Sequence, residues 1–110
     1  MNFFYLYIHM REQIVKFEIG KEKKKYKVHL KDKQTKKVRT LSFGHKDYQQ
    51  FKDRTKLQLY KHLNHGERKR MRNYYSRHSG VKTRKAGIAK EKKKNNGYYT
   101  PKLLSHIYLW

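Results

Sequence analysis

Two stretches decide the fold of this chain: YKVHL at residues 26–30 and VRTLSF at residues 38–43. Each alternates apolar and polar side chains, which is the period of a strand with one buried face. The polar residues 31–36 between them predict a turn, so the two stretches predict an antiparallel hairpin. IVKFEI at residues 14–19 alternates in the same way and predicts a third strand, which brings the sheet to about the minimum for independent stability. Its predicted buried face carries Val15, Phe17 and Ile19.

After residue 44 the apolar period changes from that of a strand to that of a helix. The spacing of Tyr48 and Phe51 predicts one short helical piece, and the spacing of Leu59, Tyr60 and Leu63 predicts another.

A further helix is predicted from Glu67 to about His78, with Met71, Tyr74 and Tyr75 on one face and a Ser-Gly pair at its end. The fold class is therefore α+β. We expect a small antiparallel sheet of about three strands, followed by two or three short helices, with extended basic arms.

The chain divides into four segments: an N-terminal extended or docking segment (1–19), a small α+β body (20–80), a basic arm (81–101) and a C-terminal helical segment (102–110). The arm is rich in Lys and has almost no large apolar residue, so a flexible or partner-moulded segment is expected. The C-terminal segment should dock on the body or on a partner, because the ring of Trp110 would otherwise lie in water.

The apolar run near the N-terminus is far shorter than the ~20 residues that a membrane-spanning helix needs. We interpret it as a strand or docking segment, with a membrane-surface anchor as the alternative. The candidate docking residues are Phe3, Phe4, Tyr5, Leu6, Tyr7 and Trp110.

The charge is extreme: 30 Lys and Arg against 8 Asp and Glu give a formal net charge of +22 in 110 residues. Self-repulsion on this scale opposes compaction, so we expect the folded state to depend on a negatively charged partner. Aromatic residues make up 15% of the chain, whereas disordered basic tails are poor in them, so a small folded body is favoured.

The candidate residues for binding a polyanion or a partner all come from basic stretches. Arg forks suit phosphates and carboxylates, and Lys runs bind phosphate backbones without reading bases. The alternative is the solvated face of an amphipathic helix. The residues are Lys23, Lys24, Lys25, Arg68, Lys69, Arg70, Arg72, Arg77, Lys82, Arg84, Lys85, Lys92, Lys93 and Lys94.

The sequence favours a protein that is not an enzyme and has no small-molecule substrate. The central carboxylates Asp47, Asp53 and Glu67 lie in no recognisable nucleophile or metal motif. We expect Asp53 to pair with Lys52 or Arg54, or to cap a turn.

No cofactor and no metal site are predicted. The chain has no Cys, which removes disulfides and thiolate ligands. His62 and His65 are three residues apart and His78 follows on the next helix, but this ligand set is incomplete, so capping and packing roles are favoured.

One set of residues in a fixed order carries a resemblance to a known group of proteins. The set is Ser42-Phe43-Gly44, Tyr48, Phe51-Lys52-Asp53, Leu57, Tyr60, His62-Leu63-Asn64-His65-Gly66, a basic helix with Tyr74 or Tyr75, Arg77-His78 and Tyr108-Leu109-Trp110. It resembles small basic proteins of uncharacterised function encoded by large DNA viruses of algae and protists, over roughly residues 26–78 and the last few residues. The chain departs from that pattern at Lys56, where Pro is expected, at Asn64, where Asp is usual, and at Gln50-Phe51, where His-Tyr is common. The resemblance implies a viral origin and a virion component, and it assigns no activity.

The leading interpretation is a structural virion protein. It would be a minor capsid protein that binds and cements major capsid protein subunits, beside further minor capsid proteins, on the inner face of the capsid, after assembly in the host cytoplasm. The alternative is a sequence-independent nucleic-acid-binding protein that packages the genome. Viral DNA and an anionic inner membrane surface are the further candidate partners.

Overall fold

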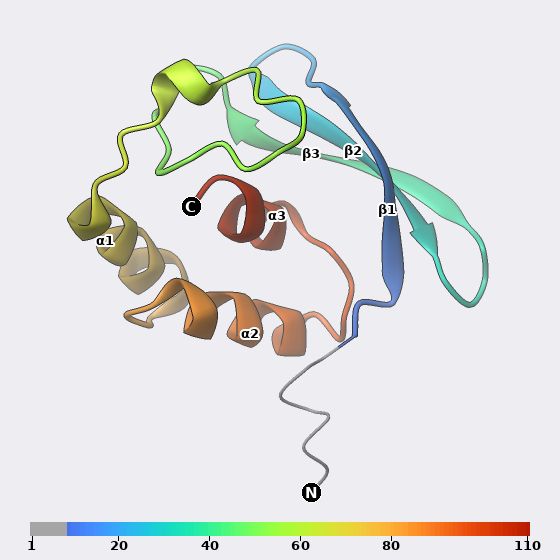
Figure 1. The fold of residues 1–110 in the computed structure, drawn as a ribbon. Coiled ribbons are helices and arrows are strands. Elements are labelled where there is room, and N and C mark those ends of the chain that lie inside the picture. Colours follow the sequence, from blue (N-terminus) through green and yellow to red (C-terminus); the bar gives the residue numbers. More distant parts are fainter. Residues whose placement is uncertain (1–8) are drawn as a thin grey trace, which may run out of the picture.

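The predicted hairpin forms two of the three strands in one antiparallel sheet (Figure 1). We analysed a computed structural model, which describes residues 9–110; the candidate docking residues Phe3–Tyr7 lie outside this range. The strands are β1 (Glu12–Ile19), β2 (Lys24–Asp32) and β3 (Val38–His45), with β2 in the centre. The expected α+β class is confirmed.

Strand β1 contains a bulge that the alternation did not reveal. Its register against β2 shifts between Ile14 and Lys16, so Val15 is an extra residue in the strand. Because one extra residue exchanges the two faces, Ile14 and Phe17 pack against the core. Val15 and Ile19 are 55% and 60% exposed. The prediction that these two residues are buried with Phe17 was wrong. The bulge takes Val15 out of the alternation, whereas Ile19, which lies opposite Tyr26, is exposed at the end of the strand.

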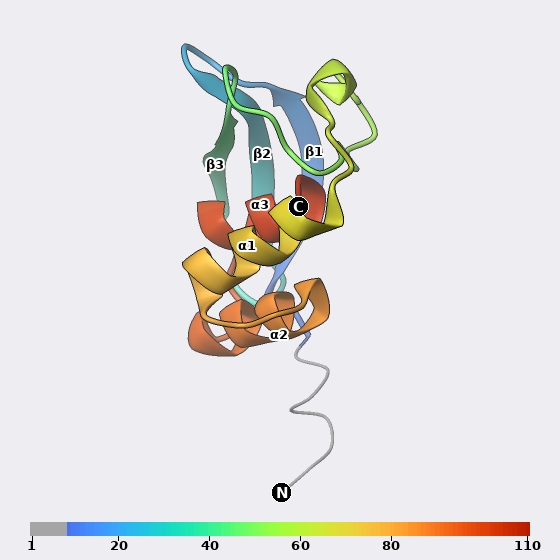
Figure 2. The ribbon, with the colours of Figure 1, turned by 90° about the vertical axis from the view of Figure 1, so that its left-hand side faces the viewer.

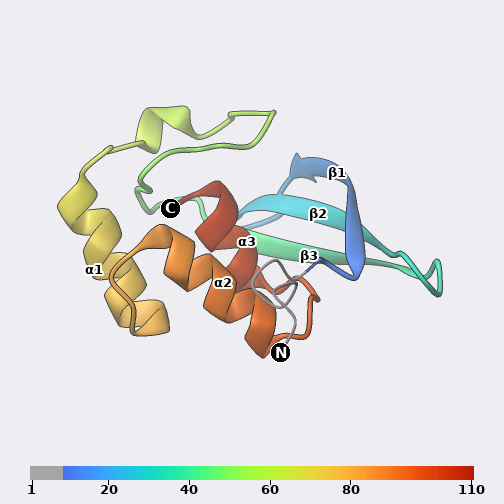
Figure 3. The same cartoon turned by 60° about the horizontal axis from the view of Figure 1, so that its bottom comes forward.

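Three helices follow the sheet and lie on one side of it, and of these α3 packs against the sheet. They are α1 (Arg68–Ser79), α2 (Arg84–Lys94) and α3 (Pro101–Tyr108). Figures 1 and 3 show α3 between the sheet and the other two helices. The core therefore lies between the sheet and α3. It consists of Tyr26, Val28 and Leu30 from β2, Phe43 from β3, and Leu104 and Leu109 from the C-terminal segment.

Helix α1 agrees with its prediction. Glu67 is the N-cap residue, and Gly80 ends the helix in the left-handed conformation with φ of 64°. Tyr74 and Tyr75 are buried as expected.

The expected flexible arm over residues 81–101 is instead largely the helix α2. The side chain of Thr83 caps its start by accepting a hydrogen bond from the amide of Ala86 at 3.1 Å. A Cβ atom at Gly87 would lie 2.5 Å from a ring carbon of Tyr75, so the missing side chain lets α2 approach α1. The residues that this helix buries are Gly87 and Glu91, and neither is a large apolar residue, which is why the sequence indicated an arm.

The two helical pieces expected between residues 46 and 63 are also absent, apart from the short 3-10 helix η2 (Lys61–Leu63). The buried carboxylate of Asp53 organises this loop by accepting hydrogen bonds from the hydroxyl of Tyr26 at 2.5 Å and from the amide of Thr55 at 3.0 Å. The expectation that Asp53 caps a turn is confirmed. Among residues 9–110, no helix is long and apolar enough to cross a membrane.

Candidate polyanion-binding surface

The fold makes an already basic chain more cationic at its surface. Three of the eight carboxylates, Glu12, Asp53 and Glu91, are buried. Only one of the 30 Lys and Arg side chains, Lys25, is buried. The interior therefore removes a larger share of the negative charges than of the positive ones, and the surface left for a partner is strongly cationic.

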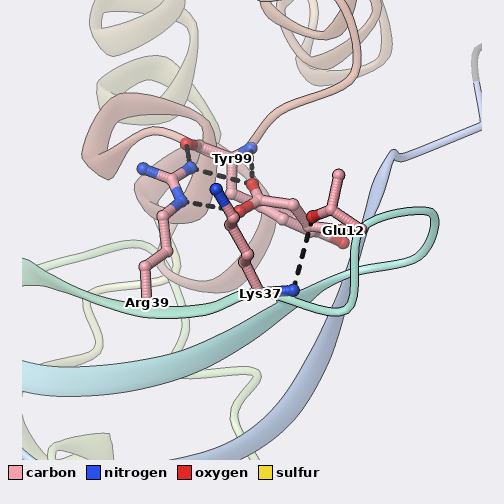
Figure 4. A network of polar contacts seen from close by, with 5 residues as sticks. Glu12, Lys37, Arg39 and Tyr99 are labelled. Atoms are coloured by element: carbon pink, nitrogen blue, oxygen red, sulfur yellow. Dashed lines mark hydrogen bonds and ion pairs between the residues drawn. The ribbon is translucent and has the colours of Figure 1, made fainter.

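The clearest internal use of a carboxylate is the pair between Glu12 of β1 and Arg39 of β3 (Figure 4). Arg39 donates from Nε and from one terminal nitrogen to the two carboxylate oxygens, at 2.6 and 2.8 Å. The amide of Tyr99 donates to the same carboxylate at 2.9 Å, and Arg39 donates to the carbonyl of Tyr99 at 2.7 Å. Burial opposes ionisation of Glu12, but the hydrogen bonds from Arg39 and Tyr99 outweigh it and lower its pKa. This network ties the segment before α3 to the sheet.

Lys25 is a correction to the predicted binding residues. Its ammonium group donates to the carbonyl of Tyr48 at 2.6 Å and to the side-chain oxygen of Gln50. Burial lowers the pKa of Lys25 to about 8, and the carboxylate of Asp53 acts in the opposite direction. Gly44 lies against its side chain, since a Cβ at residue 44 would be 3.1 Å from the Lys25 Cβ. Lys25 therefore holds the loop after β3 and cannot reach a polyanion.

The other predicted basic residues reach the surface, with two of them only partly exposed. Arg84 and Lys92 are half-buried, and Arg84 donates to the carbonyl of Ile107 at 2.7 Å. Arg84 also lines a hollow of about 200 Å³ between α1 and the start of α2, together with Arg68, Arg72 and Lys82. The exposed predicted residues are Lys23, Lys24, Arg68, Lys69, Arg70, Arg72, Arg77, Lys82, Lys85, Lys93 and Lys94.

A larger groove, of about 480 Å³, lies where the end of β3, α1 and α3 meet; Figure 2 labels these three elements. We call it the β3–α1–α3 groove. Cationic side chains reach it from three elements: Lys24 from β2, Arg77 from α1 and Lys102 from α3. Every residue that lines this groove is described by the structure, and none of them is Asp or Glu. The Lys and Arg side chains of the groove therefore meet no carboxylate side chain within its lining.

Two aromatic pairs line the same groove. The indole of Trp110 stacks on Tyr74 with ring centroids 4.4 Å apart, and Tyr48 stacks on His45 at the same distance. Trp110 was predicted to dock on the body or on a partner, and in the structure it packs on its own chain. Sequence reasoning missed Tyr48, His45 and Lys102 as site residues. The spacing predicted Tyr48 in a short helical piece, whereas Tyr48 lies in the loop after β3 and is 66% exposed.

A buried polar network connects the three helices behind this groove. The ring of His106 bonds through Nδ1 to the hydroxyl of Tyr74 at 2.8 Å and through Nε2 to the hydroxyl of Ser79 at 2.7 Å. Ser79 also donates to the carboxylate of Glu91 at 3.2 Å. Because Ser79 donates its one proton to Glu91, it accepts from Nε2 of His106, so the ring does not act as a base toward this hydroxyl. Ser79, Glu91 and His106 are also all buried. The network stabilises the packing of α1, α2 and α3.

Within residues 9–110, no group of three or more His, Asp or Glu side chains lies close enough to hold a metal ion. His62, His65 and His78 therefore do not form such a group. Comparison with models of protein families, with curated proteins and with solved structures finds no match to this chain.

Proposed function

We propose that this protein is a structural virion component, a minor capsid protein that binds and cements major capsid protein subunits on the inner face of a large DNA virus capsid. The observation that carries the proposal is the combination of a strongly cationic surface with an apolar, open sheet edge.

The sheet has two edge strands, β1 and β3, and we assign the docking role to β1. Within the described residues β1 pairs only with β2, so its other side offers unpaired backbone groups to a partner strand. Val15 and Ile19 are exposed on this strand, and Leu57 and Leu59 are exposed in the neighbouring loop. A hollow of about 390 Å³ runs between Val15 and Leu57. Exposed apolar side chains beside a free edge favour a protein partner that adds a strand.

The cationic surface supplies the long-range part of the same interaction. Complementary charge steers a partner toward contact and suppresses wrong partners, whereas apolar contact contributes to the affinity after docking. A capsid interior that presents carboxylates beside an apolar strand edge would satisfy both requirements. The expected dependence of folding on a negatively charged partner stays a prediction.

The test compares the loss of exposed apolar residues beside β1 with the loss of an exposed apolar residue elsewhere on the sheet. The double variant Val15→Ser with Leu57→Ser removes the apolar edge, and Val38→Ser removes a similarly exposed residue at the start of β3. In co-sedimentation with purified capsomers, the double variant should bind at least about tenfold more weakly, and Val38→Ser should bind like the wild type. Equal binding by all three proteins would contradict the proposal.

The second candidate function is sequence-independent packaging of nucleic acid, and the exposed cations of α1 and α2 favour it. A filter-binding titration with duplex DNA, run beside the capsomer assay at several salt concentrations, separates the two. Sub-micromolar DNA binding with a steep salt dependence, together with weak capsomer binding, would favour packaging as the main function.

A further inference from the structure

We infer that the β3–α1–α3 groove binds a short stretch of single-stranded nucleic acid, with phosphates held by the cations of its walls and a base placed against an aromatic ring. This inference goes beyond the capsid proposal. No residue lines both this groove and the hollow beside β1, so the two surfaces can be occupied and tested independently.

The charges of the groove fit a phosphate backbone. Lys24, Arg77 and Lys102 are all exposed and come from different elements, so a chain running through the groove would pass all three. Lys102 is oriented by donating to the carbonyl of His78 at 3.2 Å. Because no Asp or Glu lines the groove, its side chains add no negative charge that would repel an anion.

The aromatic rings fit the bases of a single strand. Trp110 is backed by Tyr74 with the ring planes 3° from parallel, and Tyr48 is backed by His45 with the planes 20° apart. Each ring is thus held by a neighbour before any ligand arrives. Proteins that bind single strands without sequence preference combine a cationic groove with such stacking platforms.

The same features discriminate against other anions. An acidic peptide would form ion pairs with the cations, but it gains little from contact with the aromatic rings. The bases of a duplex are already stacked on each other and cannot stack on these rings. A single strand offers both phosphates and free base faces. The volume of about 480 Å³ also falls within the ~300–1,000 Å³ of typical ligand sites.

Trp110 is the only Trp of the chain, so its fluorescence reports on the groove directly. The full chain is titrated with an oligothymidylate of about eight nucleotides, a length within the known site sizes of such grooves. A polyglutamate peptide of the same charge is the comparison probe. We expect the oligonucleotide to quench Trp110 fluorescence with a saturable, salt-dependent curve, and the peptide to bind more weakly without quenching.

Two variants separate the groove from the general charge of the protein. Tyr48→Ala should weaken oligonucleotide binding about fivefold or more. Lys24→Ala with Arg77→Ala should weaken it and lower the salt slope, since two phosphate contacts are lost. The matched control, Lys93→Ala with Lys94→Ala, removes the same charge from exposed positions on α2 and should change the affinity less than about twofold.

Three results would overturn the inference: equal losses in the two double variants, wild-type affinity of Tyr48→Ala, or quenching of Trp110 by the acidic peptide to the same extent. The last result would assign the groove to an acidic peptide. Because Tyr48→Ala leaves the β1 edge intact, its capsomer binding stays at the wild-type level, so failure here is distinguishable from failure of the capsid proposal.

Discussion

The indole of Trp110 lies parallel to the ring of Tyr74, with the centroids 4.4 Å apart and the planes 3° from parallel. The residues just before Trp110 hold the loop after β3, since the amide of Arg54 donates to the carbonyl of Tyr108 at 2.8 Å and that of Lys52 donates to Leu109 at 3.1 Å. The C-terminal residues thus connect α1 to this loop and complete one wall of the groove.

Removing the Trp110 ring should destabilise the body. We expect Trp110→Ala to lower the free energy of unfolding by about 2 kcal/mol, because a half-buried ring and its stacked pair are lost. Trp110→Phe keeps an aromatic ring on Tyr74 and should lose less than half as much. Tyr48→Ala is the control, since its ring is mostly exposed and its removal should cost at most about 0.5 kcal/mol. Urea unfolding measures all three, and equal stability of Trp110→Ala and the wild type would contradict the packing role.

The Glu12–Arg39 pair should show strong energetic coupling. Arg39→Met leaves the Glu12 carboxylate buried with only the amide of Tyr99, and we expect a loss of roughly 2 kcal/mol at neutral pH. This is below the usual cost for a fully buried pair, because the Arg39 side chain is 45% exposed. Glu12→Gln in the Arg39→Met background should recover part of the loss.

A double-mutant cycle from urea unfolding measures this coupling. The lowered pKa of Glu12 determines how the stabilisation by this ion pair changes with pH. The stabilisation is present above the ordinary pKa of a Glu and is lost as the pH falls through the lower value in the folded state. Additive effects of the two substitutions would show that the ion pair contributes nothing.

The sheet and α1 could be predicted from the sequence because their signals are local. Alternation in β2 identified Tyr26, Val28 and Leu30, and helical spacing identified Tyr74 and Tyr75; all five are buried. In these elements the backbone N–H and C=O groups bond to each other in a regular pattern, and one regular face of side chains is buried.

The errors of sequence reasoning come from contacts between distant residues. Lys25 is buried because Gly44 and the loop carbonyl of Tyr48 accommodate it, and neither contact is visible as a pattern. The bulge at Val15 reverses a face through pairing with β2. Trp110 and Tyr74 come from separate segments. His45 and Tyr48 are only three residues apart, but no local spacing places this pair beside the other one.

Gly87 should be the least replaceable small residue of α2. Gly87→Ala places a Cβ 2.5 Å from a ring carbon of Tyr75, so the helices must separate or the ring must move. We expect a loss of about 1–3 kcal/mol, although helix propensity alone favours Ala by about 1 kcal/mol. Ala89→Gly, at an exposed position of the same helix, should cost about 1 kcal/mol through propensity alone. Thermal unfolding that shows Gly87→Ala as the more stable of the two would contradict this packing.

His106 should make the body sensitive to mild acid. Burial lowers the pKa of its ring to about 4 in the folded chain; the carboxylate of Glu91 opposes this change, and the positive charges of His78, Lys102 and Arg84 add to it. The unfolded chain takes up a proton near pH 6.5, whereas the folded chain does not do so until about pH 4. The contribution of the neutral His106 ring to the free energy of unfolding is therefore complete above pH 6.5. It falls by about 3 kcal/mol as the pH drops toward 4.

Urea unfolding between pH 7 and pH 4 measures this dependence on the full chain. His106→Asn should be less stable at pH 7, because it alters the bonds to Tyr74 and Ser79, but its stability should change less across the pH window than that of the wild type. His62→Gln, at an exposed position, should keep the wild-type slope. The comparison uses the change in the free energy of unfolding with pH rather than its absolute value. A lower overall stability of His106→Asn therefore does not obscure the result. If His106→Asn retained the full wild-type slope, the ring would not be held neutral by its burial between α1, α2 and α3.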